Sequence, residues 1–165
     1  MKSTFLSLYT SAHTNAVELL YEAELLFEHH RYARAYALAF TALEEISKSQ
    51  LAADVFTGFT TEDEFFKIYR DHKKKIIRMA WATEDAKRYL DVDTENYLTV
   101  EKPKVASRMD ALYVGFDGDT IQSPADFISR EEAQSIIHTV RTAIHRITEV
   151  TEFWGHQIGT KGFMK

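Results

Sequence analysis

The chain has 165 residues, of which 45% are apolar and 27% charged, and its formal net charge is −5. It contains 11 Phe, 8 Tyr and 2 Trp but only two prolines and no cysteine. This composition excludes a disordered chain, a disulfide framework, a thiolate nucleophile and a cysteine-ligated metal site. The length predicts one domain over residues 1–165, with its core over about 4–157. With no signal peptide and no run long enough to span a membrane, we expect a cytoplasmic protein.

The charge is distributed unevenly along the chain. Residues 64–108 hold 11 basic and 8 acidic side chains, whereas residues 109–128 hold four aspartates and no lysine or arginine. The acidic total argues against general binding to nucleic acids, DNA included. The basic middle segment is where a phosphate backbone would bind, and its alternative interpretation is a solvated helix face.

Two long helices are predicted first. Apolar residues recur every three or four positions over residues 4–29, which predicts an amphipathic helix. A second helix is predicted over residues 32–55. Its first half, residues 33–43, is apolar nearly all round and therefore typical of a helix buried on most sides. Gly58 is expected to end this helix.

A third helix is predicted over residues 62–90. Either Thr60 or Thr61 is expected to cap its start, and with Glu64 it forms a capping-box pattern. Residues 91–104 lack a helical period and contain Pro103, so we expect a surface connection there.

The last helix is predicted over residues 130–154. Ser129 and Glu132 form a second capping-box pattern before it. Between the third and last helices, residues 105–113 are expected to form a short helix or turn, and residues 115–119 a tight turn. The predicted fold is therefore all-α, a four-helix bundle with an irregular excursion before the last long helix.

Three charged side chains follow the apolar half of the second helix. Glu44 and Glu45 precede Lys48 by four and three residues, so the lysine can reach either carboxylate. One hypothesis is an exposed contact worth about 0.3–0.5 kcal/mol. The other is a held Glu–Lys pair at the mouth of the bundle, motivated by the abrupt change from apolar to charged residues.

A second polar block, Asp71-His72-Lys73-Lys74-Lys75, lies on the predicted third helix. His72 and Lys75 are three residues apart and share a helix face. An imidazole that titrates near neutral pH is suited to accept a proton from a ribose hydroxyl, and lysines can meet a phosphate. The alternative is a solvated basic turn.

A third block contains Arg108 and Tyr113 and lies outside the long helices. A guanidinium can hold a phosphate or a carboxylate with two hydrogen bonds, and a tyrosine hydroxyl can donate or accept a proton. Arg108 can equally tie down the excursion over residues 104–128 through a salt bridge.

In this order and spacing, the three blocks resemble the AbiV family of abortive-infection proteins, which belongs to the HEPN superfamily of small helical bundles. The resemblance extends over about residues 12–150 and is carried by Leu43-Glu44-Glu45-Ile46-Ser47-Lys48, by His72-Lys73-Lys74-Lys75, and by Arg108 with Ala111-Leu112-Tyr113-Val114. It implies a helical, usually dimeric bacterial phage-defence protein that acts on RNA or on translation.

The sequence departs from the pattern of HEPN ribonucleases, in which four to six residues lie between an arginine and the histidine that follows it. Arg141 and His145 are one residue too close, and Arg108 keeps the spacing only to Tyr113, a tyrosine in place of histidine. Two hypotheses follow. The chain is either a variant metal-independent endoribonuclease or a fold that has kept a binding role without cleavage.

We therefore predict an abortive-infection protein that binds or cleaves RNA. The predicted base is His72, with Tyr113 as proton donor or hydrogen-bond partner and Glu45 orienting a lysine, while Glu44 has a supporting role. The predicted phosphate contacts are Arg108, Lys48, Lys73 and Lys75.

Several partners are expected: RNA, a second copy of the chain in a homodimer, and a phage-encoded activator or target protein. The alternative function is a non-catalytic module that binds a phage or translation protein, or a regulatory partner of a neighbouring toxin. We predict no cofactor and no membrane partner. We also predict no metal site, because the sequence lacks the HExxH and Glu-x-x-His motifs of metal sites in helices.

Overall fold

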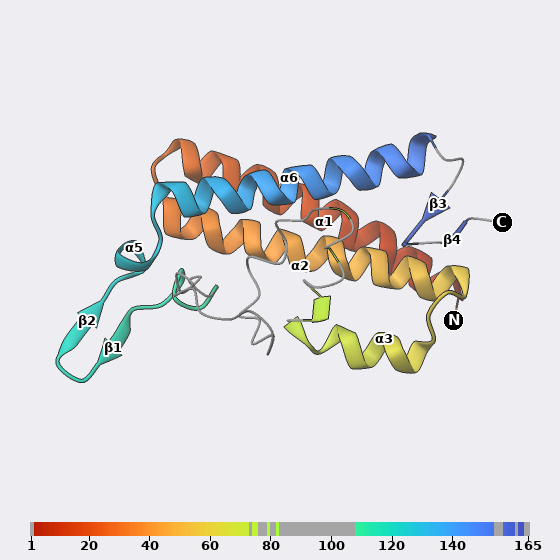
Figure 1. Ribbon diagram of the computed structural model, residues 1–165, viewed down its shortest axis with the longest axis horizontal. Coiled ribbons are helices and arrows are strands. Elements are labelled where there is room, and N and C mark those ends of the chain that lie inside the picture. The colour runs from red at the N-terminus through yellow and green to blue at the C-terminus, as the bar shows by residue number, and fades with distance from the viewer. Residues whose placement is uncertain are drawn as a thin grey trace, which may run out of the picture.

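Three long helices form the body of the molecule. The computed structural model describes residues 2–72, 74–75, 79, 82, 108–153, 157–160 and 162–163. The helices α1 (Lys2–Glu28), α2 (Tyr32–Thr57) and α6 (Arg130–Phe153) lie side by side, as Figure 1 shows. These agree with three of the predicted helices, and the all-α fold is confirmed.

Helix α2 is the centre of the bundle. Seventeen of its 26 residues are buried, including seven of the eleven in the apolar stretch over residues 33–43. Alanines that are fully buried on all three long helices, such as Ala16, Ala39 and Ala143, let the backbones approach closely. Larger side chains such as Ile46 fill the remaining space, each stabilising the fold by about 1.5–3 kcal/mol. Helix α2 therefore packs against both of the other long helices.

The predicted starts and stops of these helices are confirmed. Helix α2 ends at Gly58, which adopts the left-handed conformation at φ +81° and donates its N–H to the last turn. At the start of α6, the Glu132 carboxylate accepts the N–H of Ser129 at 2.7 Å, and the Ser129 hydroxyl accepts the N–H of Glu132 at 3.1 Å. The turn between α1 and α2 falls at residues 29–31, where the first two predicted helices meet.

The third helix is much shorter than predicted. Helix α3 (Glu62–Tyr69) begins with the expected capping box but ends at Tyr69 instead of continuing to residue 90. The reason lies at Asp71, whose side chain accepts the N–H of Lys74 at 3.0 Å while its carbonyl accepts the N–H of Lys75 at 3.1 Å. Asp71 thus caps a new helical turn, and the chain changes direction before His72.

The expected surface connection over residues 91–104 and most of the predicted helix beyond residue 75 lie outside the described residues. Residues 108–113, within the expected short helix or turn, form turns. Within the described helices, none is long and apolar enough to cross a membrane.

Two small antiparallel hairpins complete the fold, and neither strand pair was predicted. Strands β1 (Gly115–Asp117) and β2 (Thr120–Gln122) are joined at the predicted tight turn, where Gly118 has φ +62°. Helix α5 (Pro124–Phe127) follows, and strands β3 (Gln157–Ile158) and β4 (Gly162–Phe163) form the second hairpin after α6.

Candidate functional site

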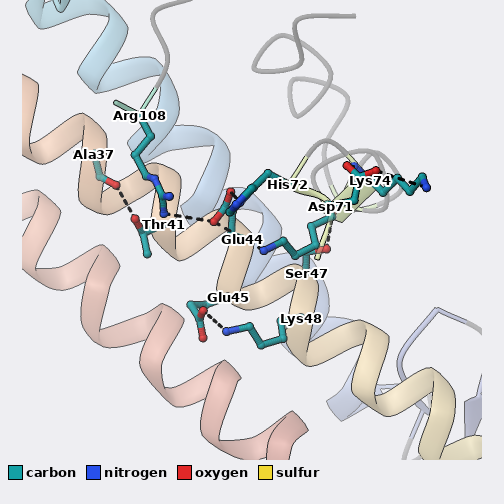
Figure 2. A network of polar contacts seen from close by, with 11 residues as sticks. Ala37, Thr41, Glu44, Glu45, Ser47, Lys48, Asp71, His72, Lys74 and Arg108 are labelled. Carbon is teal, nitrogen blue, oxygen red and sulfur yellow. Dashed lines mark hydrogen bonds and ion pairs between the residues drawn. The ribbon is translucent and has the colours of Figure 1, made fainter. Parts of the chain in front are cut away.

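A buried carboxylate in the middle of α2 is shared by three basic side chains. The Glu44 side chain is 6% exposed, and its Oε1 lies 2.6 Å from His72 Nδ1. Its Oε2 lies 3.5 Å from Arg108 NH1 and 3.9 Å from Lys75 Nζ. Figure 2 shows Arg108 and His72 converging on this carboxylate from opposite sides. We call these four residues the Glu44 cluster.

The local structure explains why the cluster forms. Leu43 and Ile46 are fully buried in the core, so the α2 surface between them faces the packed elements rather than open solvent. One turn after Glu44, the buried Ser47 donates its hydroxyl to the carbonyl oxygen of Lys75. This bond ties the helical turn that begins at Asp71 to α2, and it brings His72 and Lys75 to Glu44 together.

The basic partners differ in how far they reach solvent. The side chain of Lys75 is 8% exposed, that of Arg108 is 30% exposed and that of His72 is 61% exposed. A buried carboxylate requires charged or hydrogen-bonded partners, but one carboxylate neutralises only one cation. The cluster therefore carries a surplus of positive charge whose outer members are open to a ligand.

A second ion pair lies one turn along α2. Lys48 Nζ contacts Glu45 Oε1, and the two side chains are only 17% and 16% exposed. The ammonium groups of Lys48 and Lys75 lie 5.7 and 6.0 Å from the centre of the Tyr69 ring. Both distances suit cation–π contacts, so Tyr69 links this pair to the Glu44 cluster.

A comparison with protein-family models places this arrangement in context. The model described as AbiV, of the HEPN class, matches residues 4–145. The chain belongs to the AbiV family of HEPN proteins. The match spans α1, α2, the Glu44 cluster and most of α6. Neither the curated proteins nor the solved structures gave a match.

In this AbiV-family chain, four of the residues predicted from the sequence meet in one place. They are Glu44, His72, Lys75 and Arg108. The carboxylate that they share is Glu44, whereas Glu45 contacts Lys48.

One other predicted residue is not brought to the cluster. Tyr113 is 61% exposed, and among the described residues no hydrogen bond or ion pair joins it to Glu44 or its partners. Lys73 lies outside the described residues.

Sequence reasoning did not assign roles to Ser47 and Tyr69. Ser47 lies three residues after Glu44 and Tyr69 three residues before His72, so helical spacing offered a signal for both. That spacing alone does not show which distant element a side chain meets.

Arg141 and His145 on α6, which nearly match the HEPN ribonuclease motif, lie on the surface. Arg141 donates from Nε and NH2 to Glu24 Oε1 at 3.1 and 2.6 Å, and the Arg141 side chain is 59% exposed. His145, 74% exposed, lies 3.7 Å from Glu149 one turn away. Exposed pairs of this kind stabilise a fold by about 0–1 kcal/mol. In the part of the chain that the structure describes, no group of three His, Cys, Asp or Glu residues is placed to hold a metal ion.

The Glu44–His72 contact defines the chemistry that the cluster can perform. A carboxylate accepts the proton on Nδ1, which fixes the orientation of the ring and leaves Nε2 as the second functional nitrogen. Because the His72 side chain is 61% exposed, a ligand can approach it. Arg108 and Lys75 place positive charge at the other oxygen of the same carboxylate.

Proposed function

We propose that this AbiV-family protein binds RNA at the Glu44 cluster and cleaves its backbone without a metal ion. The supporting observation is the contact of 2.6 Å between His72 Nδ1 and a carboxylate that also contacts Arg108 and Lys75. An oriented imidazole beside surplus positive charge is what the attack of a ribose hydroxyl on its own phosphate requires.

In the proposed reaction, His72 Nε2 takes the proton of the ribose 2′-hydroxyl. The 2′-oxygen forms a bond to phosphorus, the bond from phosphorus to the 5′-oxygen breaks, and the leaving oxygen takes a proton from solvent. The products are a 2′,3′-cyclic phosphate and a 5′-hydroxyl. Arg108 and Lys75 stabilise the negative charge that grows on the phosphate oxygens.

Each residue has a separate contribution in this proposal. A positioned base accelerates proton transfer by about 10²–10⁴-fold, which is the share assigned to His72. Arg108, at the outer edge of the cluster, provides the phosphate contact. Glu44 does not touch the RNA and acts as a positioning residue through His72 and Arg108. Cleavage of cellular RNA would account for the arrest expected of an abortive-infection protein.

The test uses the purified full chain with a labelled single-stranded RNA in the presence of EDTA. We expect cleavage that leaves cyclic phosphate ends, identified by mass spectrometry, and no cleavage of the same strand with 2′-deoxyribose. His72→Ala should lower the rate by at least about 10²-fold. His145→Ala removes an exposed histidine that also contacts a glutamate and serves as the matched control.

Binding is measured separately by fluorescence anisotropy with the uncleavable strand. Arg108→Ala should weaken this binding, and His72→Ala should leave it within about twofold. Binding without cleavage would reduce the function to an RNA-binding module. Neither binding nor cleavage, or a His72→Ala rate equal to that of the control, would refute the proposed site.

A further inference from the structure

A cavity lies beside the start of α2, at the end of the bundle where Figure 1 also shows α5. Its volume is about 260 Å³. Three segments of the chain line it, namely residues 30–34, 111–112 and 123–125. We call this cavity the Arg34 pocket.

The charged side chains that line the Arg34 pocket are all basic. They are Arg31, Arg34 and His30, and among the described residues no acidic side chain belongs to the lining. Neither arginine forms an ion pair within the described part of the chain. Asp126 follows the lining in sequence, but its carboxylate accepts the N–H and the hydroxyl of Ser123, both at 2.7 Å. Two guanidinium groups without a carboxylate partner favour an anionic ligand.

His30 has a backbone conformation in which glycine is the favoured residue. Apart from glycines, it is the one described residue with a positive φ, at +59°. Any side chain at such a helix end carries a steric cost. The imidazole nevertheless lines the pocket, and its Nδ1 lies 2.8 Å from the hydroxyl of Tyr32, which lines it too. A strained residue whose side chain is held in a cavity indicates a role for that side chain beyond the turn.

We propose that the Arg34 pocket binds a second phosphate of the RNA strand that is cleaved at the Glu44 cluster, an inference that rests on the proposed function. Arg31 and Arg34 hold the phosphate oxygens through charge-assisted hydrogen bonds, and His30 is a further donor. Because no side chain caps the start of α2, the N–H groups of its first turn add donors at the same place.

Two stretches of chain connect the Arg34 pocket with the Glu44 cluster. Ala111 lines the pocket and follows Arg108 by three residues, so their Cα atoms are at most about 11 Å apart. Arg34 and Glu44 lie ten residues apart on α2, a separation of about 15 Å along the helix axis. Each nucleotide of a strand carries one phosphate, so one strand can place phosphates at both sites a few nucleotides apart. The pocket therefore contributes to binding and not to the bond that breaks.

The first test compares two ligands of the full chain, both with 2′-deoxyribose at the position of attack. One is a dinucleoside monophosphate, which has a single phosphate, and the other is an oligonucleotide. Binding is measured by NMR titration for the first and by fluorescence anisotropy for the second. Arg31→Ala/Arg34→Ala should weaken binding of the oligonucleotide by at least about tenfold. It should leave binding of the dinucleoside monophosphate within about twofold.

The matched control is Arg141→Ala/Arg146→Ala. It removes the same charge from two exposed side chains on α6, and it should leave binding of both ligands within about twofold. The salt dependence of oligonucleotide binding gives a second readout. The slope of log binding constant against log salt should become shallower by about 0.7 in Arg31→Ala/Arg34→Ala, the amount for one phosphate on a single strand. The control should keep the slope of the wild type.

His30→Gly separates binding from folding. Glycine suits the positive φ at this position, so the variant should unfold at no lower urea concentration than the wild type. It should still bind the oligonucleotide more weakly, because the pocket has lost a donor. Oligonucleotide binding equal to that of the wild type would remove His30 from the proposed site.

The outcomes distinguish the pocket from the proposed function. If the wild type cleaves RNA through His72 and Arg31→Ala/Arg34→Ala matches its control, the pocket assignment fails and the proposed function stands. The same holds if the double variant weakens both ligands equally, because the effect then acts at the cluster or on the fold. If the wild type binds neither ligand, both proposals fail.

Discussion

Helix α2 carries two buried acidic side chains that each hold a distant segment, and their partners differ in kind. Glu44 meets a histidine, a lysine and an arginine, whereas Asp54 accepts the N–H and the hydroxyl of Thr160 at 2.7 and 3.0 Å. Both residues are almost inaccessible to solvent, at 4% and 0% exposure. Burial of an acidic side chain therefore does not by itself distinguish a functional site.

The contacts of Asp54 hold the backbone of the C-terminal hairpin against α2. Gly159 has φ +75°, and a side chain there would collide with the Asp54 carboxylate, so the C-terminal hairpin approaches α2 as closely as glycine permits. At Glu44 the partners are long, ionisable side chains, of which His72 and Arg108 reach solvent. The neutral partners of Asp54 indicate a structural contact, which we call the Asp54 clasp, whereas the excess of cations at Glu44 indicates a place for an anion.

The largest expected effect is that of Glu44→Ala. It leaves Lys75, 8% exposed, without its carboxylate partner, and it removes the group that orients His72. Breaking a buried ion pair in this way costs about 3–5 kcal/mol. We expect urea unfolding to show this loss, and RNA cleavage to fall at least as far as in His72→Ala.

The neighbouring residue provides the control. Glu45→Ala removes a carboxylate that contacts only Lys48 among the described residues. We expect a loss of at most about 1 kcal/mol and little change in cleavage. If the two alanine variants lose the same stability, Glu44 is not the centre of the cluster. Glu44→Gln, which keeps the side-chain volume, separates the loss of charge from the loss of packing.

Asp54→Ala should rank second and should affect stability alone. It leaves the Thr160 N–H and hydroxyl without their acceptor, at about 1–3 kcal/mol for each buried group that stays unsatisfied. Gly159→Ala places a side chain against the Asp54 carboxylate and should also destabilise the fold. Cleavage by the folded fraction of either variant should stay within twofold of wild type. A tenfold loss would mean that the clasp also shapes the Glu44 cluster.

His13, on α1, is half-buried. In the part of the chain that the structure describes, it has no hydrogen-bond or ion-pair partner. Burial lowers the pKa of His13 below its ordinary value of 6.5. The folded state therefore binds this proton less readily than the unfolded state, and the contribution of neutral His13 is complete above about pH 6.5 and declines as the pH falls through that value. His13→Gln should lose less stability than wild type between pH 7.5 and 5.5 in urea unfolding. Equal losses would contradict this assignment.

Features that depend on contacts between neighbouring residues were predicted correctly from the sequence. The capping boxes at Thr61 and Ser129 and the stop at Gly58 depend on contacts within a few positions, and all three are confirmed. The end of α3 was missed because the apolar period continues past Tyr69, while Asp71 prefers to cap a new turn.

Contacts between distant segments were harder to predict. Glu44 and Glu45 are identical in type and adjacent, and only the packing of the turn at Asp71 against α2 determines which one His72 meets. The contact of Asp54 with Thr160 joins residues 106 positions apart, and its sequence signal was the group of three glycines after α6. Such pairings depend on the register between elements, which helical periodicity does not contain.

The smallest expected effect is that of Tyr113→Phe. This variant tests whether Tyr113, at the motif-like spacing from Arg108, has a role in cleavage. The tyrosine lies where the HEPN motif would place its histidine, yet it is 61% exposed and, among the described residues, not joined to the Glu44 cluster. Removing its hydroxyl keeps the aromatic ring in place and takes no hydrogen bond from Glu44 or its described partners. We expect cleavage and RNA binding within about twofold of wild type, as for other surface changes away from a site. A loss comparable to that of His72→Ala would show that the Tyr113 hydroxyl takes part in cleavage.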